Sequence, residues 1–215
     1  MTDKAIIRVF IADDHAIVRE GLKQILAEQR DIIVAGEAEN GVDAARLVGK
    51  ARASVMLLDI SLPDRNGIDV LKQIKKDRPD LSVLMLSMHR EDQYAIRALK
   101  AGAAGYLTKQ SAPRELVTAI RQVAGGQKYV SAALAQTLAS AIGEDHEAAP
   151  HEGLSDREYQ TLTMIASGMT VSEIARELSL SVKTISEYRA RLLAKMKLKS
   201  SAELTTYAIR NGLVD

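Results

Sequence analysis

Polar side chains of a few types stand at the ends of short apolar segments in the first half of the chain. They are Asp13 and Asp14 after residues 8–12, Asp59 after 54–58, Ser87 after 81–86, and Lys109 shortly after 105–107. Carboxylates gathered in one place repel one another unless a cation lies among them, and oxygen ligands suit Mg²⁺. An aspartate can also act as a nucleophile and form an aspartyl-phosphate. With a lysine and a hydroxyl beside it, this set of residue types suits phosphoryl transfer.

Each of these residues has a structural explanation when it is taken alone. An Asp pair after a strand often caps the following helix, and Asp14 is a candidate for that role. A single Asp or Lys after a strand is weak evidence of a site. The combination, on four segments in this order, favours a functional site.

The apolar pattern predicts the elements that must position these side chains. Predicted strands cover 8–12, 31–36, 54–58, 81–86 and 105–107. Predicted helices cover 15–28, 41–49, 93–100 and 113–124, and a further helix carries the apolar residues from Ile68 to Ile74 and ends before Pro79. Strands that alternate with helices in this way predict an open parallel sheet with helices on both faces. Ligands bind beyond the carboxyl ends of the strands in such sheets, where the polar residues stand.

The motifs around these residues resemble a known family. IADDHAIVREGL, LLDISLPDRNGIDVL, LMLS and GAAGYLTK, within roughly residues 6–125, closely resemble the receiver domain of bacterial two-component response regulators. The resemblance implies an α/β, flavodoxin-like (βα)5 fold with a parallel sheet, and Asp59 as the phosphoacceptor. It implies a Mg²⁺ ion held by Asp14, Asp59 and the backbone carbonyl of Ser61, with Asp13 acting mainly through water.

The same resemblance implies roles for the remaining polar residues. Lys109 would pair with the phosphoryl group, and Ser87 and Tyr106 would form a switch pair in which Tyr106 turns inward after phosphorylation. Ser61 and His89 would flank the phosphoryl position, with His89 expected to be a solvated loop residue. Many receivers have Pro after the lysine, whereas this chain has Gln110.

Residues 153–215 show no strand pattern and predict four helices. A capping box of Ser155 and Glu158 opens the first helix. The second and third predicted helices, 171–178 and 182–197, are separated by a tight turn, which predicts a helix-turn-helix. A last helix is predicted over 201–210. Residues 180–200 carry six Lys or Arg against the single acid Glu187, which on a helix is typical of a phosphate-binding surface.

Periodicity divides the third of these helices into two stripes. One stripe should enter the core and consists of Ile185, Tyr188, Leu192 and Met196. The opposite stripe is polar or small and consists of Lys183, Ser186, Glu187, Ala190 and Ala194, with Arg191 on its flank. Lys and Arg would contact phosphates, and Glu187 could accept a hydrogen bond from a cytosine amine.

This half of the chain resembles the LuxR-type helix-turn-helix, in LSDRE, SEIARELSLSVKTISEYRARLLAKMKLKSSAELTTYAI and NGLVD. Together the two halves resemble the NarL/FixJ family of response regulators. The resemblance implies DNA contacts from Lys183, Thr184, Ser186, Glu187, Ala190 and Arg191, with Lys195 near the DNA backbone. It implies that a cognate sensor histidine kinase phosphorylates Asp59, and that a homodimer formed on phosphorylation binds double-stranded promoter DNA. RNA polymerase is a candidate partner.

Composition predicts the domain boundaries. Residues 143–152 hold four acids, no Lys or Arg and no large apolar side chain, so we expect a linker that adds nothing to a packed core. The segment 131–142 before it has helical Ala/Leu spacing. We therefore predict a receiver domain over 1–125, a helical connector and flexible acidic linker over 126–152, and a DNA-binding domain over 153–215.

Composition also excludes several classes of protein. The chain has no cysteine, which excludes disulfides, cysteine-ligated metals and thiol catalysis. No apolar run reaches the ~18–20 residues of a membrane span, and the N-terminus lacks the apolar region of a secretory signal, so we expect a cytoplasmic protein without membrane contact.

Two other functions fit parts of the pattern. One is a constitutive DNA-binding regulator with a vestigial receiver, against which the intact set of Asp13, Asp14, Asp59, Ser87 and Lys109 argues. The other is a Mg²⁺-dependent phosphatase with an aspartate nucleophile. Such enzymes typically need a second acid near the nucleophile, and Ser61, two residues after Asp59, cannot fill that role. We therefore expect no enzyme beyond catalysis of the receiver's own phosphorylation and dephosphorylation.

Overall fold

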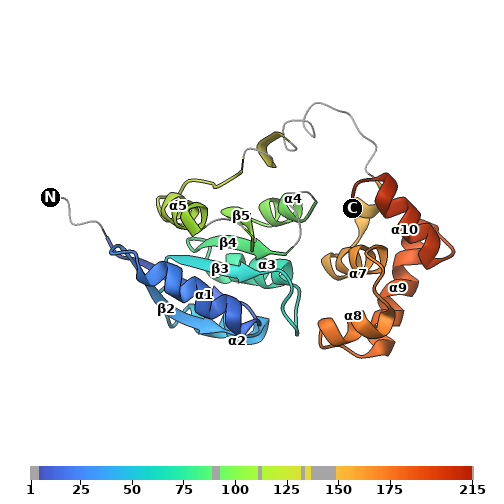
Figure 1. The fold of residues 1–215 in the computed structure, drawn as a ribbon, viewed down its shortest axis with the longest axis horizontal. Coiled ribbons are helices and arrows are strands. Elements are labelled where there is room, and N and C mark those ends of the chain that lie inside the picture. The colour runs from blue at the N-terminus through green and yellow to red at the C-terminus, as the bar shows by residue number, and fades with distance from the viewer. Residues whose placement is uncertain (1–4, 89–92, 111–112, 132–133, 137–148, 215) are drawn as a thin grey trace. The chain divides into compact units, whose positions relative to one another are not determined.

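The computed structural model describes residues 5–88, 93–110, 113–131, 134–136 and 149–214. The chain folds into two compact units, Met1–Ser140 and Ala141–Asp215, which are described separately below (Figure 1). His89 and residues 137–148, which include most of the predicted acidic linker, lie outside the described residues.

The first unit contains the predicted parallel sheet. Its strands are β1 (Ile7–Ala12), β2 (Ile32–Ala38), β3 (Val55–Asp59), β4 (Ser82–Ser87) and β5 (Gly105–Thr108), in the order β2-β1-β3-β4-β5. All four pairings are parallel, which confirms the flavodoxin-like architecture. Every residue of β3 is buried, so the backbone of Asp59 is fixed between β1 and β4.

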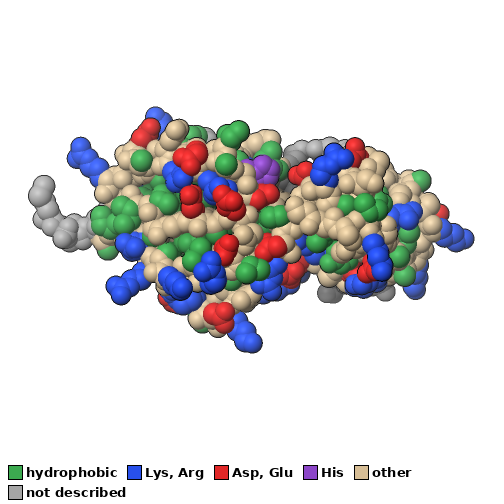
Figure 2. Space-filling view, turned by 90° about the horizontal axis from the view of Figure 1, so that it is seen from below, with side chains coloured by type: hydrophobic (Ala, Val, Ile, Leu, Met, Phe, Trp, Pro, Cys, Tyr) green, Lys and Arg blue, Asp and Glu red, His purple; other side chains and the backbone are tan. Residues whose placement is uncertain are grey.

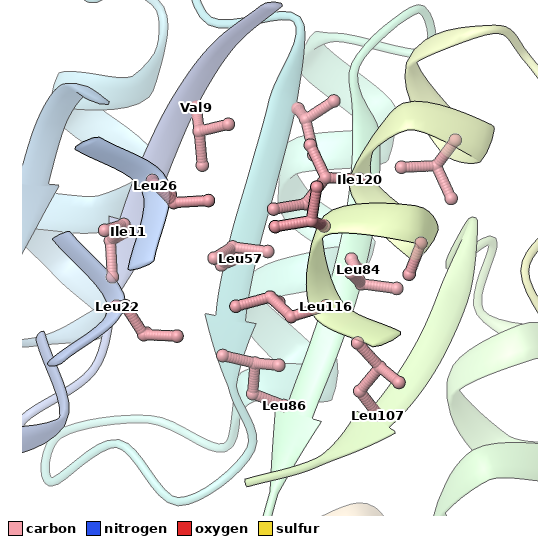
Figure 3. Packing of buried hydrophobic residues seen from close by; sticks show 14 of the residues in the cluster. Val9, Ile11, Leu22, Leu26, Leu57, Leu84, Leu86, Leu107, Leu116 and Ile120 are labelled. Carbon is pink, nitrogen blue, oxygen red and sulfur yellow. The ribbon is translucent and has the colours of Figure 1, made fainter. Parts of the chain in front are cut away.

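Helices cover both faces of the sheet, as predicted. One face carries α1 (Ala16–Ala27) and α5 (Pro113–Ala124), and the other carries α2 (Gly41–Val48), α3 (Gly67–Asp77) and α4 (Gln93–Lys100) (Figure 1). Figure 3 shows Leu22 and Leu26 of α1 and Leu116 and Ile120 of α5 against side chains of the strands, among them Leu57. This apolar layer anchors the strands whose ends carry the candidate site.

A segment that the sequence pattern did not predict as extended lies along the edge of the sheet after α5. Tyr129 forms a parallel β-bridge with Gly105, and its N–H donates to the carbonyl of Ala104 at 2.8 Å. The Tyr129 hydroxyl donates to Glu115 Oε1 of α5 at 2.8 Å. Residues 134–136 are helical, whereas the rest of the predicted helix over 131–142 lies mostly outside the described residues.

The second unit is helical. It contains a short 3-10 helix, η1 (Pro150–Gly153), followed by α7 (Asp156–Ala166), α8 (Val171–Glu177), α9 (Val182–Met196) and α10 (Ser201–Arg210). These α-helices confirm the four predicted ones. The predicted capping box is present: the Ser155 N–H donates to Glu158 Oε2 at 2.8 Å, and the Glu158 N–H donates to Ser155 Oγ at 3.4 Å.

The expectation that residues up to 152 add nothing to a core is wrong at His151. This side chain is buried, and its Nδ1 lies 2.8 Å from the hydroxyl of Tyr207 on α10. Its ring also packs at 6.4 Å from the ring of Tyr159, between centroids. An imidazole buries apolar surface while its nitrogen keeps a hydrogen bond, which a count of apolar residues does not register.

The surface mixes charges of both signs. Lys and Arg side chains alternate with Asp and Glu on the face drawn in Figure 2, in keeping with a formal net charge of +1. Among the helices within the described residues, none is long and apolar enough to cross a membrane.

Candidate functional site

The predicted acidic residues converge at the carboxyl ends of β1 and β3. Asp13, Asp14, His15 and Asp59 each offer one ligand atom, and these atoms all lie within 4.8 Å of one another. Asp13 and Asp59 are buried, whereas the side chain of Asp14 is 25% exposed. A group of carboxylate oxygens with one open side fits a hard divalent cation such as Mg²⁺, which keeps several waters. The sequence analysis did not single out His15, whose Nδ1 lies 2.7 Å from Asp14 Oδ1.

Asp13 is held by contacts on its backbone and on both carboxylate oxygens. Its N–H donates to the carbonyl of Ala38 at 3.2 Å, next to the end of β2. Its Oδ1 accepts the N–H of His15 at 2.9 Å, at the start of α1. The N-cap residue of α1 is His15, which makes no side-chain capping hydrogen bond, so the capping role suggested for Asp14 is wrong.

Lys109 joins the two buried carboxylates. Its Nζ lies 2.7 Å from Asp13 Oδ2 and 2.8 Å from Asp59 Oδ2, and its side chain is 5% exposed. Its backbone N–H donates to the carbonyl of Ser87 at 2.7 Å, which fixes the lysine beside the end of β4. Burial acts to lower the pKa of Lys109, but Asp59 and Asp13 outweigh it and the net shift is upward, so the ammonium stays charged.

Asp59 occupies the centre of this arrangement. Burial raises the pKa of its carboxyl to about 6, against the opposing effect of Lys109 and with a further rise from the charge of Asp13. The backbone N–H of Ser61 donates to Asp59 Oδ1 at 3.2 Å. Asp59 is therefore ionised at neutral pH and close to a positive charge, as a nucleophilic carboxylate requires.

The loop between β3 and α3 folds back over the backbone of Asp59. A Cβ atom added at Gly67 would lie 2.0 Å from the carbonyl oxygen of Asp59, so only glycine fits. The Asp64 carboxylate accepts the N–H groups of Gly41 and Val42 at 2.7 and 2.9 Å, at the start of α2. The sequence analysis missed this role of Asp64, which secures the loop that carries Ser61.

The predicted switch pair lies on β4 and β5. Ser87 and Tyr106 are both buried, and the Ser87–Thr108 pair aligns the ends of these two strands. We expected the Tyr106 ring to turn inward after phosphorylation. In this structure the ring is already fully buried.

The exposed face of α9 matches the predicted DNA-binding stripe. Ile185, Leu192 and Met196 are buried, which confirms most of the predicted core stripe, and Tyr188 is half-buried. All residues of the predicted stripe are exposed, namely Lys183, Ser186, Glu187, Ala190, Arg191 and Ala194, and so are Val182 and Lys195. The guanidinium of Arg191 lies 5.8 Å from the centre of the Tyr188 ring and 3.5 Å from the Glu187 carboxylate, so it is oriented by the helix itself.

Two of the predicted DNA contacts also stabilise the second unit. Thr184 is half-buried, and its N–H donates to the N-cap oxygen of Ser181 at 3.0 Å. Lys195 Nζ donates to Glu158 Oε2 at 2.6 Å and so links α9 to the start of α7. Burial acts to raise the pKa of Glu158, but the bonds from Lys195 and Ser155 outweigh it and lower this pKa. Lys195 remains about half exposed.

Comparison with protein families finds a match for each unit. The model of the response regulator receiver domain matches residues 9–121. The model of bacterial regulatory proteins of the luxR family matches residues 152–208.

Individual relatives match over nearly the full length. The chain is 40% identical to the response regulator UvrY of Escherichia coli over 208 residues, 96% of this chain and 95% of the relative. It is 38% identical to the response regulator GacA of Pseudomonas aeruginosa, covering 97% and 98% of the two chains. Among solved structures, RcsB of Salmonella enterica bound to the rprA promoter with the phosphomimetic BeF3⁻ is 30% identical, with a TM-score of 0.65 over 94% of this chain and 98% of that one.

Proposed function

Because this chain belongs to the NarL/FixJ family of two-component response regulators, with a receiver and a LuxR-type DNA-binding domain, we propose that phosphorylation of Asp59 controls its binding to promoter DNA. The observation that carries this proposal is the contact of Lys109 with both Asp59 and Asp13 at 2.8 and 2.7 Å. A buried nucleophilic carboxylate beside a fixed ammonium suits the transfer of a phosphoryl group.

The reaction transfers a phosphoryl group from a phosphohistidine of a cognate sensor kinase. A carboxylate oxygen of Asp59 attacks the phosphorus, the P–N bond breaks, and an acyl phosphate forms on Asp59. Lys109, at 2.8 Å from Asp59 Oδ2, then pairs with the new phosphoryl oxygens. The hydroxyl of Ser87 supplies a hydrogen bond to the same oxygens.

The metal assigned to this site is Mg²⁺. Asp14, Asp59 and the backbone carbonyl of Ser61 would hold it directly, and Asp13 would hold it mainly through water. When bound, the ion supplies positive charge for the oxygens of the transferred group. The convergence of Asp13, Asp14 and Asp59 within 4.8 Å supports this assignment.

The output is sequence-specific binding to double-stranded DNA by α9. Lys183 and Arg191 would contact phosphates, and Glu187 would face base edges in the major groove. We infer a homodimer as the phosphorylated, DNA-binding form, RNA polymerase as a further partner, and the cytoplasm as the place of action. The RcsB relative solved on promoter DNA with BeF3⁻ supports a link between phosphorylation and DNA binding.

This proposal limits the chain's catalysis to its own phosphorylation and dephosphorylation. A constitutive DNA-binding regulator with an inactive receiver is the alternative. The geometry of Asp13, Asp59 and Lys109 favours a working receiver, because burying two carboxylates and an ammonium together has a cost that a vestigial site would not need to keep.

The assignment of Asp59 is tested by labelling the full chain. Incubation with acetyl phosphate and Mg²⁺ should add one phosphoryl group, measured by intact-protein mass spectrometry, and Asp59→Asn should abolish this addition. Asp80→Asn is a matched control because Asp80 is exposed and pairs with Arg78 instead. Labelling of Asp59→Asn to the wild-type extent would refute the site.

A further inference from the structure

Arg19 is a buried cation on α1 whose role the site description leaves open. Its Nη1–H donates to the backbone carbonyl of Asp13 at 2.7 Å. Its Nη2–H donates to Glu39, directly after β2, and its Nε lies 3.7 Å from the Glu37 carboxylate. The guanidinium therefore ties the loop between β1 and α1 to the end of β2.

The bond from Arg19 fixes the peptide that joins the first two acidic residues. The Asp13 N–H is held by Ala38 on β2, and the oxygen of the next peptide is held by Arg19. The Asp13 carboxylate has additional contacts with Lys109 and with the N–H of His15. Among the described residues, the side chain of Asp14 contacts His15, whose Nδ1 lies 2.7 Å from Asp14 Oδ1. The direction of Asp14 thus depends strongly on the backbone that Arg19 holds.

An arginine suits this task better than other side chains. Its planar guanidinium presents several donors in a fixed geometry, so one group can hold a carbonyl and a carboxylate at once. A lysine ammonium is a compact point charge without this fork. A methionine could fill the buried space without desolvating a charge, but it could donate to neither acceptor.

We propose that Arg19 is a positioning residue for the divalent cation: it holds the Asp13–Asp14 peptide so that both carboxylates face Asp59. This inference rests on the proposed function, because it assumes that the acidic residues bind Mg²⁺. Residues that orient metal ligands typically affect metal affinity about 10- to 100-fold.

Arg19→Met in the full chain tests the proposal. The dissociation constant for Mg²⁺ alone, without a phosphodonor, is measured by titration of ¹⁵N-labelled protein in NMR spectra. We expect the constant to rise about tenfold. The Mg²⁺ concentration that gives half-maximal labelling by acetyl phosphate should rise in parallel.

Lys23→Met is the matched control. Lys23 lies one turn further along α1 and pairs with Glu37 at 3.1 Å and with Glu20 at 2.6 Å, and neither partner belongs to the loop between β1 and α1. The Lys23→Met substitution removes the same charge from the same helix, and we expect a Mg²⁺ affinity equal to that of the wild type or slightly tighter. Urea unfolding of both variants in EDTA measures any general loss of stability, which by itself would leave the affinity of the folded protein unchanged.

The sign of the effect separates positioning from simple electrostatics. Removal of a positive charge near the carboxylates should by itself tighten cation binding. An unchanged or tighter Mg²⁺ affinity in folded Arg19→Met would therefore overturn the proposal. If Arg19→Met does not fold, Arg19→Lys decides. This substitution keeps the charge and loses the fork, so weaker Mg²⁺ binding than in the wild type supports positioning, and binding equal to the wild type overturns it.

Failure of the proposed function has a different signature. A wild-type protein that binds no Mg²⁺ would overturn the metal assignment and this inference together. A wild-type protein that binds Mg²⁺, beside an Arg19→Met variant that binds it equally well, would overturn the inference alone.

Discussion

At the scale of single residues, Asp59 combines burial with charged neighbours of both signs. Its carboxylate lies 2.8 Å from the Lys109 ammonium, and a second carboxylate, that of Asp13, lies 2.7 Å from the same ammonium. Burial dominates, so the pKa of Asp59 rises to about 6. Ionised Asp59 therefore has a cost to folding, which a bound divalent cation would offset.

Asp59→Asn should stabilise the metal-free protein. A pKa raised from 3.8 to about 6 means that ionised Asp59 destabilises the folded state at pH 7. A pKa difference of one unit corresponds to about 1.4 kcal/mol, so we expect the substitution to raise the free energy of unfolding by about 1–3 kcal/mol. Lys109 keeps Asp13 as its partner in the variant. Urea unfolding in EDTA measures the difference.

The pH dependence of this difference has a fixed sign. Because the folded state binds its proton more tightly than the unfolded state, the destabilisation is fully present above pH 6 and is lost as the pH falls from about 6 towards 3.8. The gain in free energy of unfolding from Asp59→Asn should therefore be about half as large at pH 5 as at pH 7. An advantage that grows as the pH falls, or an Asn variant less stable than the wild type at pH 7, would contradict this account.

The sequence predicted the residues at strand ends but not those that hold them. Asp13, Asp59 and Lys109 could be found because the ends of parallel strands meet at one edge of a sheet. Asp64 could not, since it accepts the N–H groups of Gly41 and Val42, which only folding brings near. Arg19 could not, since its bond to the Asp13 carbonyl depends on the path of the loop between β1 and α1. Judged by residue type alone, an arginine on a helix fits an exposed face, and an aspartate between a strand and a helix fits an ordinary loop.

At the scale of elements, the edge of the sheet beside β5 depends on a glycine. A Cβ atom at Gly105 would lie 2.7 Å from the Tyr129 carbonyl oxygen and 2.9 Å from a methyl carbon of Leu84. The missing side chain lets the chain after α5 lie against β5, the strand that carries Tyr106. The start of the predicted connector is therefore anchored to β5, which carries one residue of the predicted switch pair.

Gly105→Ala should loosen this anchor. The added methyl group must displace Tyr129 or Leu84, and overpacking of this kind costs about 1–3 kcal/mol of unfolding free energy. Urea unfolding should show that loss, and hydrogen exchange should show faster exchange of the Tyr129 N–H, which donates to Ala104 at 2.8 Å.

Gly49→Ala provides the matched control for this substitution. Gly49 has a helical φ of −64° and no atom within 4 Å of an added Cβ, so the same change should leave stability the same or slightly higher. Equal unfolding midpoints for Gly105→Ala and Gly49→Ala would contradict the close approach described above.

Most helices and strands could be predicted because apolar residues recur in them with a clear helical or strand period. The elements that were not predicted are short. The bridge at Tyr129 is a single residue pair, and η1 spans four residues, so neither has a period to detect. The Lys195–Glu158 pair joins residues far apart in the sequence, so no local pattern predicts it, and the resemblance implied only that Lys195 lies near the DNA backbone.

At the scale of the whole molecule, input and output lie in separate compact units. The receiver site belongs to Met1–Ser140, and the exposed basic face of α9 belongs to Ala141–Asp215. Charge of both signs is spread over the surface in Figure 2, so DNA binding depends on the local pattern of α9 rather than on the net charge of +1. Control of DNA binding by Asp59 must therefore be a coupling between distinct sites.

The most direct test of this coupling is the affinity of the full chain for DNA. A duplex selected by the protein from random sequences is titrated by fluorescence anisotropy in Mg²⁺, with and without beryllofluoride, which stands in for the phosphoryl group. We predict that beryllofluoride tightens binding by about tenfold in the wild type and has no effect on Asp59→Asn. Equal affinity of the wild type under both conditions would contradict the account and identify a constitutive DNA-binding protein.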